Sequence, residues 1–152
     1  MKDAPDSPAE LRARALRLLA RREHSRAELA RRLARHAASG EAIEDLLLDL
    51  EERKQLSDER FASERAHSLS RKYGAARIRH DLRSKGVAEE FVELAFKSSS
   101  EGELERGKIM LQKKFPLPAA NLNERARRMR FLQSRGFSCQ VIYSLLSSRD
   151  AD

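Results

Sequence analysis

The stretch Ser70–Val87, SRKYGAARIRHDLRSKGV, decides the fold of this 152-residue chain. It holds six Lys or Arg and a single acid, yet Ile78 and Leu82 lie four residues apart, as on one face of an amphipathic helix. Its last six residues, LRSKGV, are echoed fifty residues later by LQSRGF at Leu132–Phe137. A basic helix followed by a glycine therefore occurs more than once, which indicates an internal repeat.

The repeat extends over the whole chain. Leu33, Leu82 and Leu132 align at intervals of 49 and 50 residues. Apolar residues recur every three or four positions in nine segments, and no segment alternates as a strand would. The segments expected to be helical are 8–23, 26–37, 41–54, 58–72, 75–85, 88–97, 101–115, 123–135 and 138–148.

Three helices per period predict an all-α fold, an elongated tandem array of three three-helix repeats, over residues 8–55, 56–99 and 100–148. Capping boxes, in which a serine precedes a glutamate by three residues, are expected to start helices at Ser7, Ser25 and Ser100. Each repeat should have a small core of its own. Besides the aligned leucines, the expected core residues include Leu11, Ala15, Leu29, Leu46, Leu47, Leu50, Phe61, Ala62, Ala66, Ile78, Leu94, Ala95, Leu104, Leu111, Met129, Ile142, Leu145 and Leu146.

The composition points to an anionic partner in a reducing compartment. Charged residues make up 36 % of the chain, and the net charge of +7 favours nucleic acid first. No apolar run approaches the roughly 20 residues of a membrane span, and the N-terminus has no apolar core of a secretory signal. The single Cys139 excludes an intramolecular disulfide. We therefore expect a cytoplasmic protein.

Charge is sorted by helix within each repeat. Residues 41–52 hold six acids and no base, whereas the middle helix of every repeat is basic. A solvated face explains one such helix, but the same sign on the same helix three times favours a stripe that faces phosphates or an acidic protein groove. The candidate partner-binding residues are Arg31, Arg32, Arg35, Arg77, Arg79, Arg83, Lys85, Arg127, Arg130, Arg135 and Phe131.

The remaining candidates for a binding or catalytic role also have structural explanations. Phe131 lies on the helix side of the arginines, where it either stacks on a nucleic-acid base or packs against a neighbouring helix. Gly102 and Gly107-Lys108 nearly spell a phosphate-binding loop, but Ile109 stands where Ser or Thr would ligate magnesium. The four histidines lie far apart, without the spacing of metal ligands. We expect no catalytic residue, metal or cofactor.

Four motifs carry a resemblance to a known family. ALRLLARREHSRAELARRL (Ala15–Leu33), LSDERFA (Leu56–Ala62), SRKYGAARIRHDLRSKG (Ser70–Gly86) and RFLQSRGF (Arg130–Phe137) together resemble the bacterial RecX family. The resemblance runs over residues 11–146. The chain departs from it where many relatives have proline in place of Ala75, and Arg128 occupies the core register of Leu29 and Ile78.

The resemblance implies a regulatory protein that is not an enzyme. RecX-like proteins bind the RecA recombinase in the groove of its filament on single-stranded DNA, and they inhibit its ATP hydrolysis, co-protease action and strand exchange. Some bind DNA themselves, so single-stranded DNA is a second expected partner. We expect a monomer. The alternatives are a stand-alone helical DNA-binding module, since three-helix units with a basic middle helix suit helix-turn-helix recognition, and a neutral helical scaffold.

Overall fold

The computed structural model describes residues 4–100 and 102–150, with only the backbone for 98–100 and 148–150. Within these residues the chain forms nine α-helices and no strand. They are α1 (Pro8–Arg21), α2 (Arg26–Leu33), α3 (Gly40–Glu52), α4 (Asp58–Leu69), α5 (Ala75–Ser84), α6 (Glu89–Ser100), α7 (Glu103–Lys114), α8 (Leu122–Ser134) and α9 (Cys139–Asp150).

Local capping explains most of the helix starts. The side chains of Ser7 and Ser25 accept hydrogen bonds from the amides three residues on, and the glutamates there complete both expected capping boxes. The third expected capping box, at Ser100, does not start a helix. Helix α6 continues through Ser100, and the N-cap of α7 is Gly102, with φ 75°. Helix α2 also ends earlier than expected, at Leu33, because a turn follows it.

Each set of three helices encloses its own core. The first core is built almost entirely of leucine, the second mixes Phe61 with alanines and valines, and the third contains Phe137. Large aliphatic side chains are spread over three small cores, so each repeat is thin. The fully buried large aliphatic side chains are Leu11, Leu29, Leu33, Leu47, Leu50, Ile78, Leu82, Val92, Leu111, Leu132 and Leu145.

Three expected core residues lie at the surface instead. Leu94 is 54 % exposed, and Leu104 and Met129 are each 39 % exposed. In α7 the buried residues are Glu103, Gly107 and Leu111, which are spaced four apart and place Leu104 outside this face. In α6, Val92 and Ala95 are buried, which places Leu94 outside.

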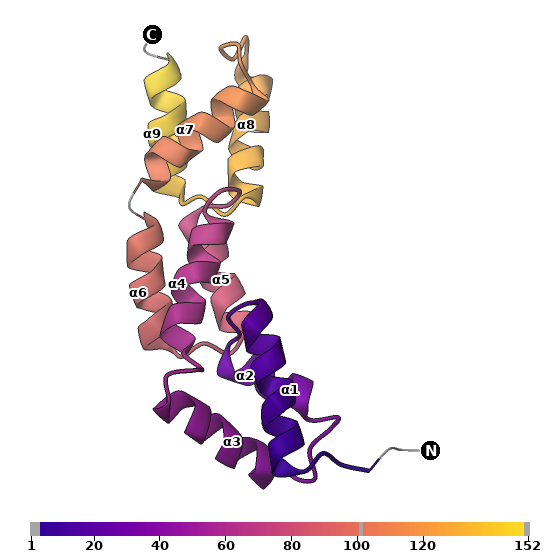
Figure 1. The fold of residues 1–152 in the computed structure, drawn as a ribbon. Helices are drawn as coiled ribbons and strands as arrows, with labels where there is room; N and C mark the ends of the chain where they lie inside the picture. Colours follow the sequence, from indigo (N-terminus) through magenta and orange to yellow (C-terminus); the bar gives the residue numbers. More distant parts are fainter. Residues whose placement is uncertain (1–3, 101, 151–152) are drawn as a thin grey trace.

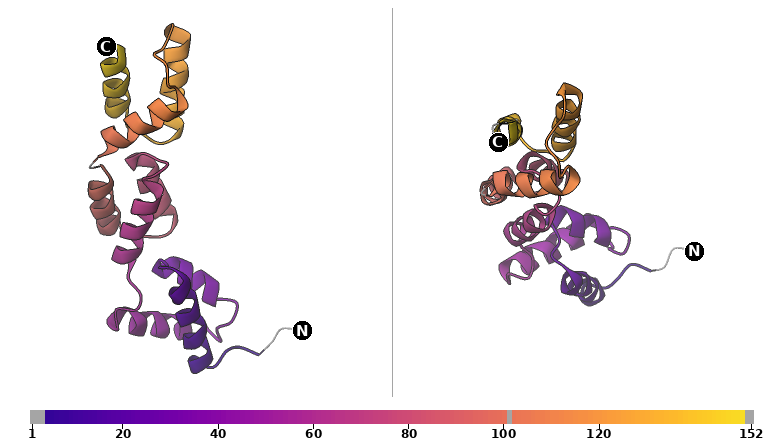
Figure 2. Two further views of the ribbon diagram at one scale, coloured as in Figure 1. Left: turned by 45° about the horizontal axis from the view of Figure 1, so that its top comes forward. Right: turned by 90° about the horizontal axis from the view of Figure 1, so that it is seen from above.

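The repeats follow one another along a rod. Figure 1 shows α1–α3 at one end, α4–α6 in the middle and α7–α9 at the other end, with the described ends of the chain far apart. The turned views in Figure 2 show the same succession without folding back. The expected elongated array of three three-helix repeats is therefore confirmed, while the boundaries 8–55, 56–99 and 100–148 stay predictions.

Candidate functional site

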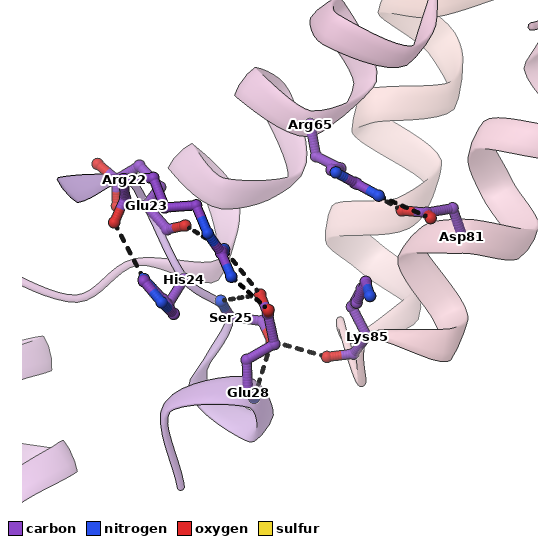
Figure 3. A network of polar contacts seen from close by, with 8 residues as sticks. All are labelled: Arg22, Glu23, His24, Ser25, Glu28, Arg65, Asp81 and Lys85. Atoms are coloured by element: carbon purple, nitrogen blue, oxygen red, sulfur yellow. Dashed lines mark hydrogen bonds and ion pairs between the residues drawn. The ribbon is translucent and has the colours of Figure 1, made fainter. Parts of the chain in front are cut away.

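The three middle helices, α2, α5 and α8, are stacked end to end. Ser25, the N-cap residue of α2, donates a 2.7 Å hydrogen bond from its hydroxyl to the carbonyl oxygen of Lys85, the C-cap residue of α5 (Figure 3). One repeat further on, the amide of Gly74, the N-cap residue of α5, donates a 2.7 Å hydrogen bond to the carbonyl oxygen of Arg135, the C-cap residue of α8. The positive end of each middle helix thereby meets the negative end of the next. We call these three helices the middle-helix column.

Glycine allows this close stacking at both joints. Gly86 follows α5 with φ 76°, and a Cβ atom there would lie 2.6 Å from the Cβ atom of Ala27. Gly136 follows α8 with φ 84°, and a Cβ atom there would lie 2.3 Å from the Cβ atom of Arg77. A side chain is disfavoured at both positions by the positive φ and by the contact. The glycine repeated in the sequence thus lets α5 pack closely on repeat 1 and α8 on repeat 2.

Polar contacts fix the segment that positions Ser25 (Figure 3). Arg22 and Glu28 form an ion pair at 3.0 Å, and the amide of Ser25 donates to Glu28 at 3.3 Å. Burial alone would raise the pKa of Glu28, but the hydrogen bonds from Arg22 and Ser25 hold this pKa below its ordinary value. His24 is buried beside them, with Nδ1 3.0 Å from the carbonyl oxygen of Arg22, and burial lowers the pKa of His24.

Arg31 and Arg32 of α2, and Arg35 in the turn after it, are exposed and line one hollow of about 410 Å³ together with Arg14 and Leu18 of α1 and with His36. Within the described part of the chain, none of these three arginines of repeat 1 forms an ion pair. Their charge is therefore available to an anionic partner. This part of the predicted stripe lies as the helical spacing indicates, although no contact with a partner is present to test it.

Two candidate arginines of α5 are engaged within their own repeat. Arg79 pairs with Glu93 at 2.7 Å, and Arg83 pairs with Glu89 at 2.5 Å. The hydrogen bond from Arg83 holds the pKa of Glu89 below its ordinary value. The acids belong to α6, so the acidic third helix partly neutralises the basic middle helix of repeat 2. Within the expected basic stripe, α5 therefore has fewer unpaired arginines to offer a partner than α2 has.

The other two candidates of repeat 2 lie at the joints. The guanidinium of Arg77 donates to the carbonyl oxygen of Ser134 at 3.2 Å, and its Cζ atom lies 4.8 Å from the ring centroid of Tyr73. Lys85 is half-buried and offers its carbonyl oxygen to Ser25. Both residues thus hold neighbouring repeats together, besides any contact with a partner.

In repeat 3, Phe131 packs against a neighbouring ring and stays partly exposed. It is half-buried, and its ring meets the ring of Phe115 edge to face, with centroids 5.6 Å apart and planes at 83°. The guanidinium of Arg135 lies 5.4 Å from the Phe131 centroid, and that of Arg127 lies 5.8 Å from the Phe115 centroid. Arg130 is exposed and forms no ion pair with any described residue. Phe131 thus packs against a neighbouring ring, as one of the two expected alternatives states. The part of it that stays exposed lies beside Arg135.

Arg128 sits in the core register of its repeat, as the alignment with Leu29 and Ile78 predicts. It is only 5 % exposed, and its Nη2 atom donates to the carbonyl oxygen of Leu117 at 2.6 Å. Its Cζ atom lies 5.1 Å from the centroid of Phe115. An arginine thus replaces a core aliphatic residue and ties the loop before α8 to the third core.

The near-match to a phosphate-binding loop is part of a helix. Gly107 lies inside α7, where a Cβ atom would lie 2.6 Å from the Leu145 side chain. Its absent side chain therefore serves the packing of α7 on α9. Among the described residues no group of three or more His, Cys, Asp or Glu side chains is placed to hold a metal ion. In the described part of the chain no helix is both long and apolar enough to cross a membrane.

Sequence reasoning missed two features. Glu103 is buried and accepts a 3.2 Å hydrogen bond from the amide of Ala75, so repeat 3 caps the helix of repeat 2. A second basic hollow, of about 410 Å³, also lies where repeats 2 and 3 meet. Its cations come from segments far apart in sequence, so only a run such as Lys113-Lys114-Phe115, where cations adjoin an aromatic residue, could have signalled it. The lining residues are Arg71, Lys72, Met110, Lys113, Lys114, Phe131 and Arg135.

Comparison with known families and proteins gives a consistent result. Three family models match in succession: the first three-helix domain of RecX over residues 12–50, the second over 57–95 and the third over 101–146. A regulatory protein RecX of Herbaspirillum seropedicae is 45 % identical over 138 residues, which are 91 % of this chain and 90 % of that protein. One of Leptothrix cholodnii is 44 % identical over 140 residues, 92 % of this chain and 89 % of that protein.

Solved structures agree in fold. The crystal structure of RecX from Lactobacillus salivarius superposes with a TM-score of 0.84 at 18 % identity, over 95 % of this chain and 97 % of that one. A crystal structure of regulatory protein RecX gives 0.75 at 20 % identity, over 92 % of this chain and 74 % of that one. The repeated three-helix architecture, the three matched domains and the identity to curated relatives over nine-tenths of the chain lead to one conclusion. This chain belongs to the RecX family of regulatory proteins.

Proposed function

We propose that this protein binds the filament that the RecA recombinase forms on single-stranded DNA and inhibits its ATP hydrolysis, co-protease action and strand exchange. The proposal is supported by membership of the RecX family and carried by one observation, the end-to-end stacking of three basic middle helices through Ser25–Lys85 and Gly74–Arg135. The protein acts by occupancy, as a monomer in the cytoplasm, without catalysis of its own.

A rod of three repeats suits a helical filament. Several weak contacts on one chain bind as one, because each contact raises the local concentration of the next. The middle-helix column and the turn after α2 supply such contacts along the rod. Arg31, Arg35 and Arg130 form no ion pair within the described part of the chain. A body in the filament groove excludes a second DNA duplex and holds neighbouring subunits in a state that does not hydrolyse ATP.

The alternative, stand-alone duplex recognition by a helix-turn-helix, is less well supported. A recognition helix must present several side chains to base edges in the major groove. In α5, Arg79 and Arg83 already pair with Glu93 and Glu89. Both ends of α5 are also covered by the neighbouring middle helices. Docking α5 into a groove would break these contacts.

The test is ATP hydrolysis by recombinase on single-stranded DNA, with substoichiometric amounts of this protein. The variant R31E/R35E reverses two exposed, unpaired charges, one on α2 and one in the turn after it, and should weaken inhibition at least about tenfold, more so at low salt. The control R21E/K54E makes the same change of charge in the same repeat, but at the end of α1 and after α3. Full inhibition by R31E/R35E, or equal loss in the control, would refute the proposal.

A further inference from the structure

The hollow between repeats 2 and 3 has the chemistry of a site for a flexible polyanion. It measures about 410 Å³, and five of its seven lining residues are Lys or Arg, with no acid among them. Arg71 and Lys72 follow α4, Lys113 and Lys114 end α7, and Arg135 follows α8. Within the described residues none of the five forms an ion pair. Bringing like charges together without acids is unfavourable unless an anion is bound there.

An aromatic ring lies among these cations. Phe131 lines the same hollow and is half-buried, in an edge-to-face contact with Phe115 and with the Arg135 guanidinium 5.4 Å from its centroid. Met110 lines the wall beside it. Cations around an aromatic platform are the arrangement by which proteins hold single strands, since phosphates contact the cations while a base stacks on the ring. An acidic peptide or a lipid surface would need the charges but not the ring.

The other two repeats differ from repeat 3 at the position equivalent to Phe131. The residues directly before the aligned leucines are Arg32, Asp81 and Phe131. In repeat 2, Asp81 pairs with Arg65 of α4 through two hydrogen bonds of 2.9 and 3.1 Å, so that charge is neutralised (Figure 3). In repeat 1, Arg32 lines a basic hollow that contains His36 but no Phe, Tyr or Trp. Of these three equivalent places, the one in repeat 3 combines unpaired cations with a phenyl ring.

We propose that this hollow binds single-stranded nucleic acid, with phosphates on Lys113, Lys114, Arg71 and Lys72 and a base stacked against Phe131. Duplex DNA cannot use the ring, because its bases are already stacked. The inference rests on the proposed function only in that a recombinase filament presents single-stranded DNA, and the contact itself needs no recombinase.

The test is fluorescence anisotropy of a labelled oligothymidylate with the full-length protein alone, over a series of salt concentrations. The variant K113A/K114A should weaken binding at least about tenfold and lower the slope of log K against log salt by about 1.4, for two lost phosphate contacts. F131L keeps an apolar side chain and should weaken binding several-fold with the slope unchanged. Thermal unfolding checks that both variants are folded.

The control K54A/K108A removes two exposed charges outside the hollow, so its net charge equals that of K113A/K114A. It should bind nearly as the wild type does. No binding by the wild type at low salt, equal loss in the control, or equal competition by duplex DNA would each overturn the inference. Inhibition of recombinase without oligonucleotide binding would sink this inference alone, and oligonucleotide binding without inhibition would sink the proposed function alone.

Discussion

The hydroxyl of Ser25 donates a 2.7 Å hydrogen bond to the carbonyl oxygen of Lys85, sixty residues further along the chain. The same oxygen of Ser25 accepts a 3.1 Å hydrogen bond from the amide of Glu28. One buried side chain therefore caps α2 and joins repeat 1 to repeat 2. At the next joint the N-cap residue is Gly74, which has no side chain, and the amide makes the corresponding bond.

Replacing Ser25 with alanine should cost more than the loss of an ordinary cap. The change removes the cap of α2, worth about 1 kcal/mol, and the bond to Lys85, whose buried loss adds about 1–2 kcal/mol. Ser39→Ala is the matched control, because Ser39 caps α3 through Ala42 alone and is exposed. Urea denaturation measures both. Equal destabilisation of the two variants would mean that the joint contributes nothing.

Gly136→Ala should loosen the joint between repeats 2 and 3. The residue has φ 84°, which costs an alanine about 1 kcal/mol, and the new Cβ atom would lie 2.3 Å from the Cβ atom of Arg77 and 2.7 Å from its amide nitrogen. The total loss should reach about 2 kcal/mol or more. Gly40→Ala serves as the control, since nothing lies within 4 Å of its added Cβ atom.

Thermal unfolding gives the stability of both glycine variants, and hydrogen exchange of the Gly74 amide reports the joint itself. Gly40→Ala should leave that exchange unchanged and be neutral or slightly stabilising. If Gly136→Ala left the protection of the Gly74 amide intact, the close stacking of α8 on α5 would not depend on the glycine.

Glu103 caps α5 from the next repeat. Gly74 cannot be replaced by a capping serine, because a Cβ atom there would lie 2.7 Å from the backbone of Gly136. The carboxylate of Glu103 instead accepts from the Ala75 amide at the positive end of α5. Glu103→Ala should cost about 1–2 kcal/mol, and Glu103→Gln less, because an acceptor remains. Faster exchange of the Ala75 amide in the alanine variant alone is the expected signature.

Stability should fall in mild acid because of His24. Its pKa is lowered by burial, so the neutral ring is the form the fold accommodates. For a group whose folded pKa is depressed, the stabilisation is present above the unfolded value, about 6.5 for histidine, and is lost as the pH falls through the folded value. Each unit of depression is worth about 1.4 kcal/mol.

His24→Asn keeps a donor near the carbonyl oxygen of Arg22 but does not titrate in this range. Urea midpoints at pH 7.5 and pH 5 should therefore converge for the variant and differ for the wild type. The neighbouring acids are the same in both proteins, so the difference between the two pH dependences isolates the histidine. An identical pH dependence in both proteins would show that His24 does not titrate on unfolding.

The sequence by itself determined the helices, their number per repeat and the charge on each. Ser7 and Ser25 start helices where their capping boxes lie, because capping is a contact within four residues. The aligned leucines Leu33, Leu82 and Leu132 are all fully buried, because period and hydrophobicity are local in sequence. The family resemblance, carried by motifs along the chain, is confirmed for the same reason.

Only the tertiary structure decided which charges are free. Arg83 and Arg31 are both arginines on the basic middle helix of a repeat, and the sequence does not distinguish them. In the structure Arg83 pairs with Glu89 of α6, while Arg31 lines an open hollow. The cap from Glu103 to Ala75 and the gathering of Lys113 beside Arg71 were equally beyond the sequence. These contacts depend on how one helix lies against another, and a charge acts through distance in space, which residue spacing along one helix cannot give.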